Sequence, residues 1–289
     1  MSELTSARST PPSTSAHRPT STVPGVPPVS GVTPPRTAVA LGIVGFALLV
    51  LPLIGLTLRT PWTRIGELLT DPVVLQALRL SLTSSVAALV VSVVFGVPLA
   101  LVFARYDFPG KPFVRALAVL PMVLPPVVGG VGLLAAFGRR GLVGQPLAAA
   151  TGITVPFTWV AVVLAATFVA MPFLIVTVES GLRMVDPRLE DAAATLGADR
   201  WTILRRVVLP ALWPSLAAGM ALCWARALGE FGATITFAGN LPGRTQTMPL
   251  GVYLELERNP EAAYLISFVL LAVSVGVLVA LRDRFLTTT

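Results

Sequence analysis

Two charged residues interrupt an otherwise apolar segment late in the sequence. Arg226 and Glu230 stand four positions apart, which predicts that they share one face of a helix. A charge within an apolar span costs on the order of a few kcal/mol, so such residues mark an ion pair or a polar path. Both interpretations stay open: a pair that fixes helix packing, or the flank of a gated pathway for a polar solute. Thr234 and Thr236 would line that pathway with hydroxyls, and Glu230 is the only carboxylate expected deep in a span.

A second stretch has the pattern of two helices separated by a turn. Pro187 favours the first turn of a helix and Asp186 is well placed to cap it. Residues 188–196 are good helix formers, and Gly197 tolerates the left-handed geometry of a helix end. Asp199 then caps a second short helix. The pattern predicts a helix–turn–helix lying across a membrane surface.

The side chains of this stretch indicate contact with another protein. Ala192 and Ala193 leave one face flat, so a partner can approach the backbone closely. Glu190 and Asp191 add charge for pairing at the rim, and Trp201 is carried by the second helix. The alternative is an amphipathic anchor that rests in the lipid interface, but such an anchor favours more basic and bulky apolar residues.

Composition places the chain in a membrane. It is 54% hydrophobic and 12% charged, with a mean hydropathy of +0.81, values typical of integral membrane proteins. Pro121, Pro125 and Pro126 predict that the third apolar span is kinked or broken. Six helical spans are expected, at residues 37–58, 81–104, 116–137, 157–178, 213–238 and 262–281.

Several kinds of chemistry are excluded by what the sequence contains. The single histidine, His17, and the single cysteine, Cys223, leave no catalytic His constellation and no metal site. Gly110-Lys111 lacks the upstream glycine and the following hydroxyl of a phosphate-binding loop, so the chain itself would not bind ATP. No basic stripe interleaved with aromatic residues points to nucleic acid. We therefore expect a non-enzymatic protein with no cofactor of its own.

Charge also predicts orientation. Residues 1–36 are rich in Ser, Thr and Pro and are expected to be a disordered cytoplasmic tail. With this tail inside, the inside loops hold a modest excess of arginine and lysine, as the positive-inside rule requires. Both termini and the stretch around Gly197 would then be cytoplasmic.

The stretch around Gly197 resembles the "EAA" loop of permease subunits of binding-protein-dependent ABC importers, the loop that docks on a separate ATPase. The matching residues are Asp191, Ala192, Ala193, Leu196 and Gly197, followed after nine residues by Val207, Leu209 and Pro210. Two positions depart from the usual pattern, since Asp191 stands for Glu and Val207 for Ile. Gly96, Pro98 and Ala100 also fit the family.

Three further segments look like molybdate permeases within this family. They are GEFGATITF at 229–237, NLPGRTQTMPL at 240–250 and LPPVVGGVG at 124–132. Sulfate permeases are the nearest relatives and usually differ around the first segment. The resemblance covers residues from about 75 to 283.

This resemblance implies an all-α, polytopic membrane protein with six transmembrane helices and the ABC importer permease fold. Residues 37–74 would form the first helix and an external loop, and 75–283 the transmembrane domain with a coupling loop at 179–212. The coupling residues would be Glu190, Asp191, Ala192, Ala193, Gly197 and Trp201, and the translocation path or gate would hold Arg226, Glu230, Thr234, Thr236, Pro125 and Pro126.

The resemblance also implies an assembly and a function. Two such chains would form a homodimer in the bacterial cytoplasmic membrane, with a cytoplasmic subunit that binds ATP and Mg and an extracytoplasmic molybdate-binding protein. Molybdate import is the expected function. Sulfate or thiosulfate import is the first alternative, and an ATP-independent channel or secondary transporter is the alternative from another class.

Overall fold

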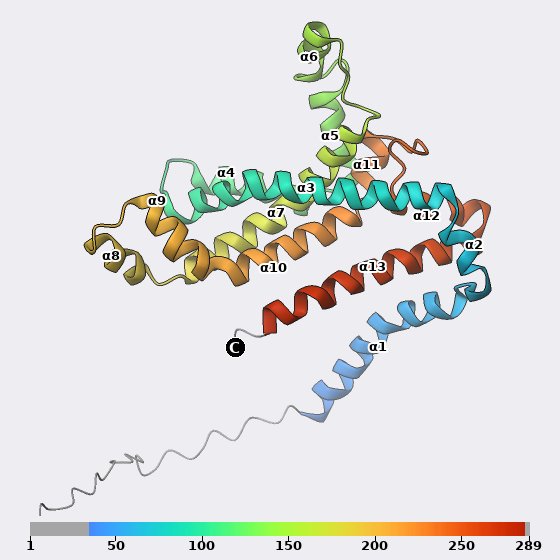
Figure 1. The fold of residues 1–289 in the computed structure, drawn as a ribbon, viewed down its shortest axis with the longest axis horizontal. Coiled ribbons are helices and arrows are strands. Elements are labelled where there is room, and N and C mark those ends of the chain that lie inside the picture. Colours follow the sequence, from blue (N-terminus) through green and yellow to red (C-terminus); the bar gives the residue numbers. More distant parts are fainter. Residues whose placement is uncertain (1–34, 287–289) are drawn as a thin grey trace, which may run out of the picture. The chain divides into compact units, whose positions relative to one another are not determined.

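The computed structural model describes residues 35–286, and every regular element in this range is a helix. The chain divides after Leu51 into two units. The first helix, α1 (Arg36–Arg59), spans that division. The bundle of helices lies in the second unit (Figure 1). The tail expected at residues 1–36 falls, except for its last two residues, outside the described part of the chain.

The elements after α1 alternate long apolar helices with short ones. They are η1 (Trp62–Arg64), α2 (Ile65–Leu69), α3 (Pro72–Arg105), α4 (Lys111–Val119), η2 (Leu120–Met122), α5 (Pro126–Phe137), α6 (Gly144–Thr151), α7 (Trp159–Met184), α8 (Pro187–Thr195), α9 (Arg200–Ile203), the π-helical η3 (Leu204–Val208), α10 (Leu209–Leu228), α11 (Gly232–Phe237), α12 (Met248–Arg258) and α13 (Pro260–Leu286).

Each expected membrane span overlaps helices, although the third and the fifth are each divided between more than one helix. Among the described residues, five helices are long and apolar enough to cross a membrane, or six if one bent pair counts as a single span. The bent pair is Lys111–Met122 with Pro126–Phe137, which meet at 115°. The break falls at the predicted prolines because proline has no N–H to donate and clashes with the preceding turn. The predicted break in the third span is therefore confirmed.

Helix α7 forms the centre of the bundle. It packs against both α3 and α10, and the three run side by side (Figure 1). In its apolar window 61% of the residues are buried, against at most 33% in any other span. Small residues such as Ala166 and Ala170 let the neighbouring backbones approach, and Leu174 and Ile175 fill the space between them.

A second close contact joins α5 to α11. A Cβ atom on Gly130 would lie 2.6 Å from the Cβ of Thr236 and 2.9 Å from the carbonyl oxygen of Ala233. A Cβ on Gly232 would lie 2.8 Å from the Cβ of Pro126. Glycine at both positions is what allows the two helices to touch.

The expected fifth span, residues 213–238, is not one helix. Helix α10 ends at Leu228 and α11 begins at Gly232. The break arises because Glu230 accepts a hydrogen bond from the backbone N–H of Ala233 at 2.7 Å, so its side chain starts a new helix instead of continuing the old one. The prediction that Arg226 and Glu230 share one helical face is therefore wrong, although the two side chains do meet.

The second helix of the predicted helix–turn–helix is also longer than expected. Instead of a separate short helix, α9, η3 and α10 form one continuous helical run, Arg200–Leu228. Leu204–Val208 is a π-helical turn that ends two residues before Pro210. The wider turn is a reasonable consequence of that proline, because its ring conflicts with the carbonyl of residue 206 in a regular α-helix.

The α5–α11 contact predicts a contrast between two glycines of the same helix. Gly130→Ala forces an atom into Thr236 and Ala233 and should destabilise the folded protein by about 1–3 kcal/mol. Gly132→Ala meets nothing within 4 Å and should be neutral or slightly stabilising. Unfolding of the two variants in detergent, followed by circular dichroism, measures the difference; equal stabilities would show that the contact is looser than described.

Candidate functional site

Helix α8 is held at both ends by local hydrogen bonds. At its start, Asp186 accepts from the backbone N–H of Arg188 at 2.9 Å. At its end, Gly197 adopts φ +85° and donates to the carbonyl of Ala194 at 2.9 Å, while Ala198 donates to that of Ala193 at 3.1 Å. These two bonds form a complete Schellman motif. The predicted cap and the predicted glycine stop are confirmed, and α8 is a short helix closed at both ends.

The next helix begins as predicted at Asp199. Its carboxylate accepts a hydrogen bond from the backbone N–H of Thr202 at 3.3 Å, and hydrogen bonds from Thr202 hold the pKa of Asp199 below its usual range. A negative charge is favourable at the N-terminus of a helix because it faces the positive end of the helix dipole. The turn between α8 and the Arg200–Leu228 run is thus defined on both sides.

The structure places the predicted coupling residues on α8, on the turn after it and, for Trp201, on α9. Asp191 and Ala192 are exposed and Ala193 is half-buried. Leu196 is 88% exposed and Trp201 is 62% exposed. Large apolar side chains exposed beside charges and small residues are typical of a surface that meets another protein. We call Asp191, Ala192, Leu196, Gly197 and Trp201 the α8 surface.

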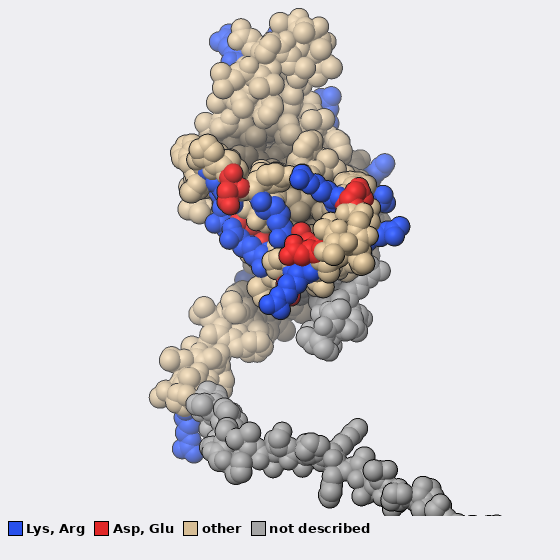
Figure 2. Space-filling view, turned by 90° about the vertical axis from the view of Figure 1, so that its left-hand side faces the viewer, with Lys and Arg blue, Asp and Glu red and all other residues tan. Residues whose placement is uncertain are grey.

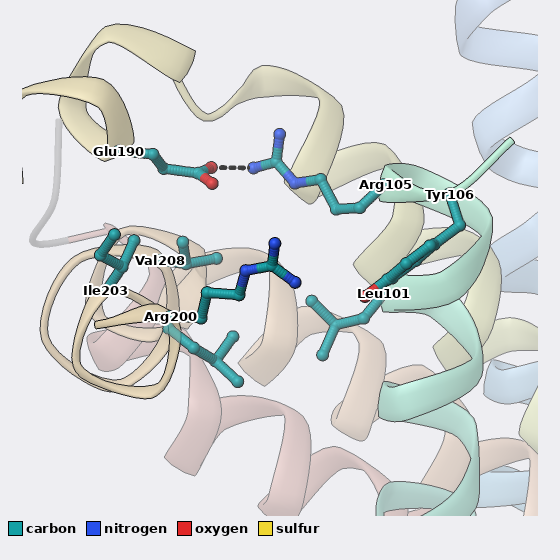
Figure 3. Close-up of a pocket in the computed structure, with 8 residues that line it drawn as sticks. Leu101, Arg105, Tyr106, Glu190, Arg200, Ile203 and Val208 are labelled. Atoms are coloured by element: carbon teal, nitrogen blue, oxygen red, sulfur yellow. Dashed lines mark hydrogen bonds and ion pairs between the residues drawn. The ribbon is translucent and has the colours of Figure 1, made fainter. Parts of the chain in front are cut away.

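Glu190 differs from the rest of this set because it is turned inward. Its carboxylate pairs with the guanidinium of Arg105, the last residue of α3 (Figure 3). The pair lies at a cleft of about 460 Å³, which the side chain of Arg200 also enters. Glu190 therefore makes a contact within the chain, where the sequence suggested a charge at the rim of a docking surface.

Charged side chains gather at the end of the bundle where α8 and α9 lie (Figure 2). Lys111 Nζ lies 2.8 Å from Asp107 Oδ1, and the hydrogen bond and charge of Lys111 hold the pKa of Asp107 below its usual range. A charged end on an apolar bundle is the part that water or another protein covers.

A second buried carboxylate lies in a span, contrary to expectation. Glu179, in α7, is only 1% exposed and accepts from Arg115 Nε at 2.9 Å and Arg183 Nη2 at 2.8 Å. Glu230 is therefore not the only acid inside a span. The error came from ending the fourth span at residue 178, whereas α7 continues to Met184.

The predicted gate residues fall around the break between α10 and α11. Glu230 is 2% exposed, and its Oε2 lies 2.7 Å from Arg226 Nη1. Its other oxygen, Oε1, accepts from the backbone of Ala233. The ion pair, one of the two interpretations that the sequence left open, is present. Its two partners come from different sides of a helix break, so it ties the end of α10 to the start of α11.

The two threonines and two prolines of the prediction lie nearby. Thr234 is buried, and the hydroxyl of Thr236 donates to the carbonyl of Gly232 at 2.9 Å. Pro125 and Pro126 are exposed at the start of α5. The structure thus brings Pro126 and Thr236 into the α5–α11 contact. Their part in a translocation path stays a prediction.

Four residues of these sites were not predicted from the sequence. Arg105 is 85 positions from Glu190, and no local pattern connects them. Glu179 and Arg183 had a usable signal, because they are four positions apart at the end of an apolar span. Arg115, the other partner of Glu179, comes from α4 and depends on tertiary packing.

Comparison with known proteins assigns this architecture to a family. The model of the family described as the inner membrane component of binding-protein-dependent transport systems matches residues 92–288. The chain belongs to this family. It is therefore a multi-pass membrane protein and a permease subunit of a transporter.

Individual relatives of this permease support the same assignment. The molybdenum transport system permease protein ModB of Mycobacterium bovis is 44% identical over 250 residues, which cover 86% of this chain and 94% of that protein. The sulfate transport system permease protein CysT of Escherichia coli (strain K12) is 38% identical over 245 residues, covering 82% and 88%.

A solved structure shares the fold. It is the crystal structure of a bacterial ABC transporter involved in the import of the acidic polysaccharide alginate, with a TM-score of 0.70 and 17% identity, covering 88% of this permease and 96% of that chain. At this identity the likeness shows a shared fold, and it confirms the all-α ABC permease architecture expected from the sequence.

The Glu179 cluster predicts that removing its arginines destabilises the protein more than neutralising its carboxylate does. Replacing Arg115 and Arg183 together by Ala leaves a buried carboxylate without a partner and should cost about 3–5 kcal/mol of folding free energy. Glu179→Gln keeps the shape and should cost about 1 kcal/mol, because the two arginines are roughly half exposed and remain hydrated.

Unfolding of the purified permease in detergent measures this asymmetry. The matched control removes two other arginines, Arg139 and Arg140, which are exposed between α5 and α6 and should tolerate Ala. If Glu179→Gln proves the more damaging change, the carboxylate is not held by these arginines.

Proposed function

We propose that this permease moves molybdate inward across the bacterial cytoplasmic membrane. A separate subunit binds ATP and Mg and supplies the energy, and an extracytoplasmic binding protein delivers the oxyanion. The choice of molybdate as the substrate rests on the 44% identity over 86% of the chain to a molybdenum transport system permease protein. The family description itself supports dependence on a binding protein.

The geometry of α8 supports a mechanical role in coupling. The helix follows α7 after Val185 and Asp186, and it precedes the Arg200–Leu228 run after one turn. Both neighbours are core helices of the bundle. A partner that moves the α8 surface therefore moves two packed helices at once, which is how small displacements switch a bundle between two states.

In this proposal the α8 surface and both termini face the cytoplasm, and two copies of the chain form a homodimer. The charged end of the bundle at α8 and α9 supports this orientation, since it would then lie on the side where ATP is hydrolysed. The opposite orientation would leave the α8 surface without access to an ATPase.

The Arg226–Glu230 pair supports a path for an anion that must be released. An unpaired buried arginine would hold an oxyanion too tightly for transport, because its charge would meet the anion in surroundings of low dielectric. Pairing with Glu230 at 2.7 Å neutralises that charge. We infer that Arg226 and Glu230 border the path at the α5–α11 contact, with Thr234, Thr236, Pro125 and Pro126 beside it.

Sulfate is the second candidate substrate, favoured by the 38% identity over 82% of the chain to a sulfate permease. Direct measurement of uptake distinguishes the two oxyanions as substrates. In vesicles holding the permease with its ATPase and binding protein, we expect uptake of radiolabelled molybdate that depends on ATP, with sulfate taken up at least about tenfold more slowly. Faster sulfate uptake would reverse the assignment, and uptake without the ATPase would indicate a channel or secondary transporter.

Gly197 offers a test of the coupling role with a matched control. Gly197 and Gly152 both end a helix with positive φ, +85° and +72°, and a Cβ on either meets nothing within 4 Å. Asp at each position therefore introduces a similar backbone strain. Gly197→Asp should abolish uptake because it alters the α8 surface, whereas Gly152→Asp, at the end of α6, should retain most of it.

Uptake and membrane content of the two variants are measured side by side. Normal molybdate uptake by Gly197→Asp would reject the docking role of α8. An equal loss in both variants would show that the strained turn, and not the docking surface, is responsible.

A further inference from the structure

We propose that Arg105 is a positioning residue that transmits the movement of α8 to the end of α3. This inference rests on the proposed function, in which a partner moves α8. The chain itself already connects α8 to α7 and to the Arg200–Leu228 run, and this contact adds α3 as a third helix. The contact that carries it is the ion pair of Arg105 with Glu190 (Figure 3).

The pair joins parts of the bundle that are distant in sequence. Arg105 is the last residue of α3, and Glu190 lies in the first turn of α8. Within residues 35–286, it is the ion pair that connects α8 to another helix. The closest packing neighbours of α8 are α9 and η3, which follow it in the chain.

A cleft separates α8 and the following helix from the end of α3. It measures about 460 Å³ and is lined by Leu101 and Tyr106 on the α3 side and by Ile203 and Val208 on the other. Leu101, Ile203 and Val208 also join the hydrophobic cluster between α3 and the helix that follows α8, whereas α8 itself is linked to the end of α3 by the ion pair. The Arg105–Glu190 pair bridges this hollow, so the last turn of α3 follows α8 through the pair.

The exposure of the pair argues against a role limited to stability. The side chains of Arg105 and Glu190 are 30% and 27% exposed. Ion pairs this accessible contribute little to folding, because water screens them in both states. The guanidinium does provide a planar, directional contact that holds a carboxylate in place. Such a contact is suited to fixing geometry.

A charge-reversal cycle on the complete complex of permease, ATPase and binding protein tests the link. Arg105→Glu and Glu190→Arg should each lower molybdate uptake about tenfold or more, and the double variant should recover to within about threefold of wild type, as expected for directly coupled residues. Charge reversal is preferred to neutral substitution, because Arg200 lies in the same cleft and offers Glu190 a replacement. Arg105→Lys should retain intermediate uptake.

A second readout separates coupling from assembly. Both single variants should still co-purify with the ATPase and hydrolyse ATP, while stimulation of hydrolysis by the loaded binding protein falls in parallel with uptake. The control is the pair of Lys111 and Asp107, which also joins a basic to an acidic side chain at this end of the bundle but includes no residue of α8. Reversing it with Lys111→Asp and Asp107→Lys should leave both readouts unchanged.

The outcomes distinguish this inference from the proposed function. Unchanged uptake in Arg105→Glu, or single losses that the double variant does not repair, overturns the link while import itself stands. If the wild-type complex imports no oxyanion, the proposed function itself is wrong. If Arg105→Glu does not accumulate in the membrane, Arg105→Gln replaces it, with an expected loss of about threefold and the same two readouts.

Discussion

The packing of α7 against α3 and α10 is the interaction on which the rest of this permease depends. These helices approach closely because small residues such as Ala166 and Ala170 line the contact. The α8 surface continues from the end of α7 and leads into the helix that contains α10. Its position, and any movement it transmits, is therefore set by this three-helix core. Without this packing, a movement of α8 would not be passed on to the other helices of the bundle.

Charges within the bundle follow one physical requirement, which is that each buried carboxylate finds a partner. Glu179 meets two arginines near one end of α7, and Glu230 meets Arg226 at the break between α10 and α11. In both cases the acid is almost fully buried and its arginines are more exposed. The arginines can keep part of their hydration while the acids cannot, so each cluster joins helices at a place where separation would be costly.

The breaks in the apolar helices also determine how the bundle packs. Pro125 and Pro126 end one helical segment and start another, and the side chain of Glu230 does the same at the start of α11. The two restarted segments, α5 and α11, then pack through Gly130 and Gly232. Both segments are helices of at most 12 residues that begin at a break in an apolar stretch. The proposed path lies beside this contact between two broken helices.

The amino-acid sequence by itself determined the apolar spans, the broken third span, and both ends of α8, because proline geometry, glycine conformation and Asp caps act over a few residues. It also offered an ion pair of Arg226 and Glu230 as one of two interpretations. Only the tertiary structure decided that Glu190 turns toward Arg105, that Arg115 reaches Glu179, and that the fifth span breaks at Glu230. These depend on how distant helices pack and on which buried groups lack another partner, and neither is encoded in local spacing.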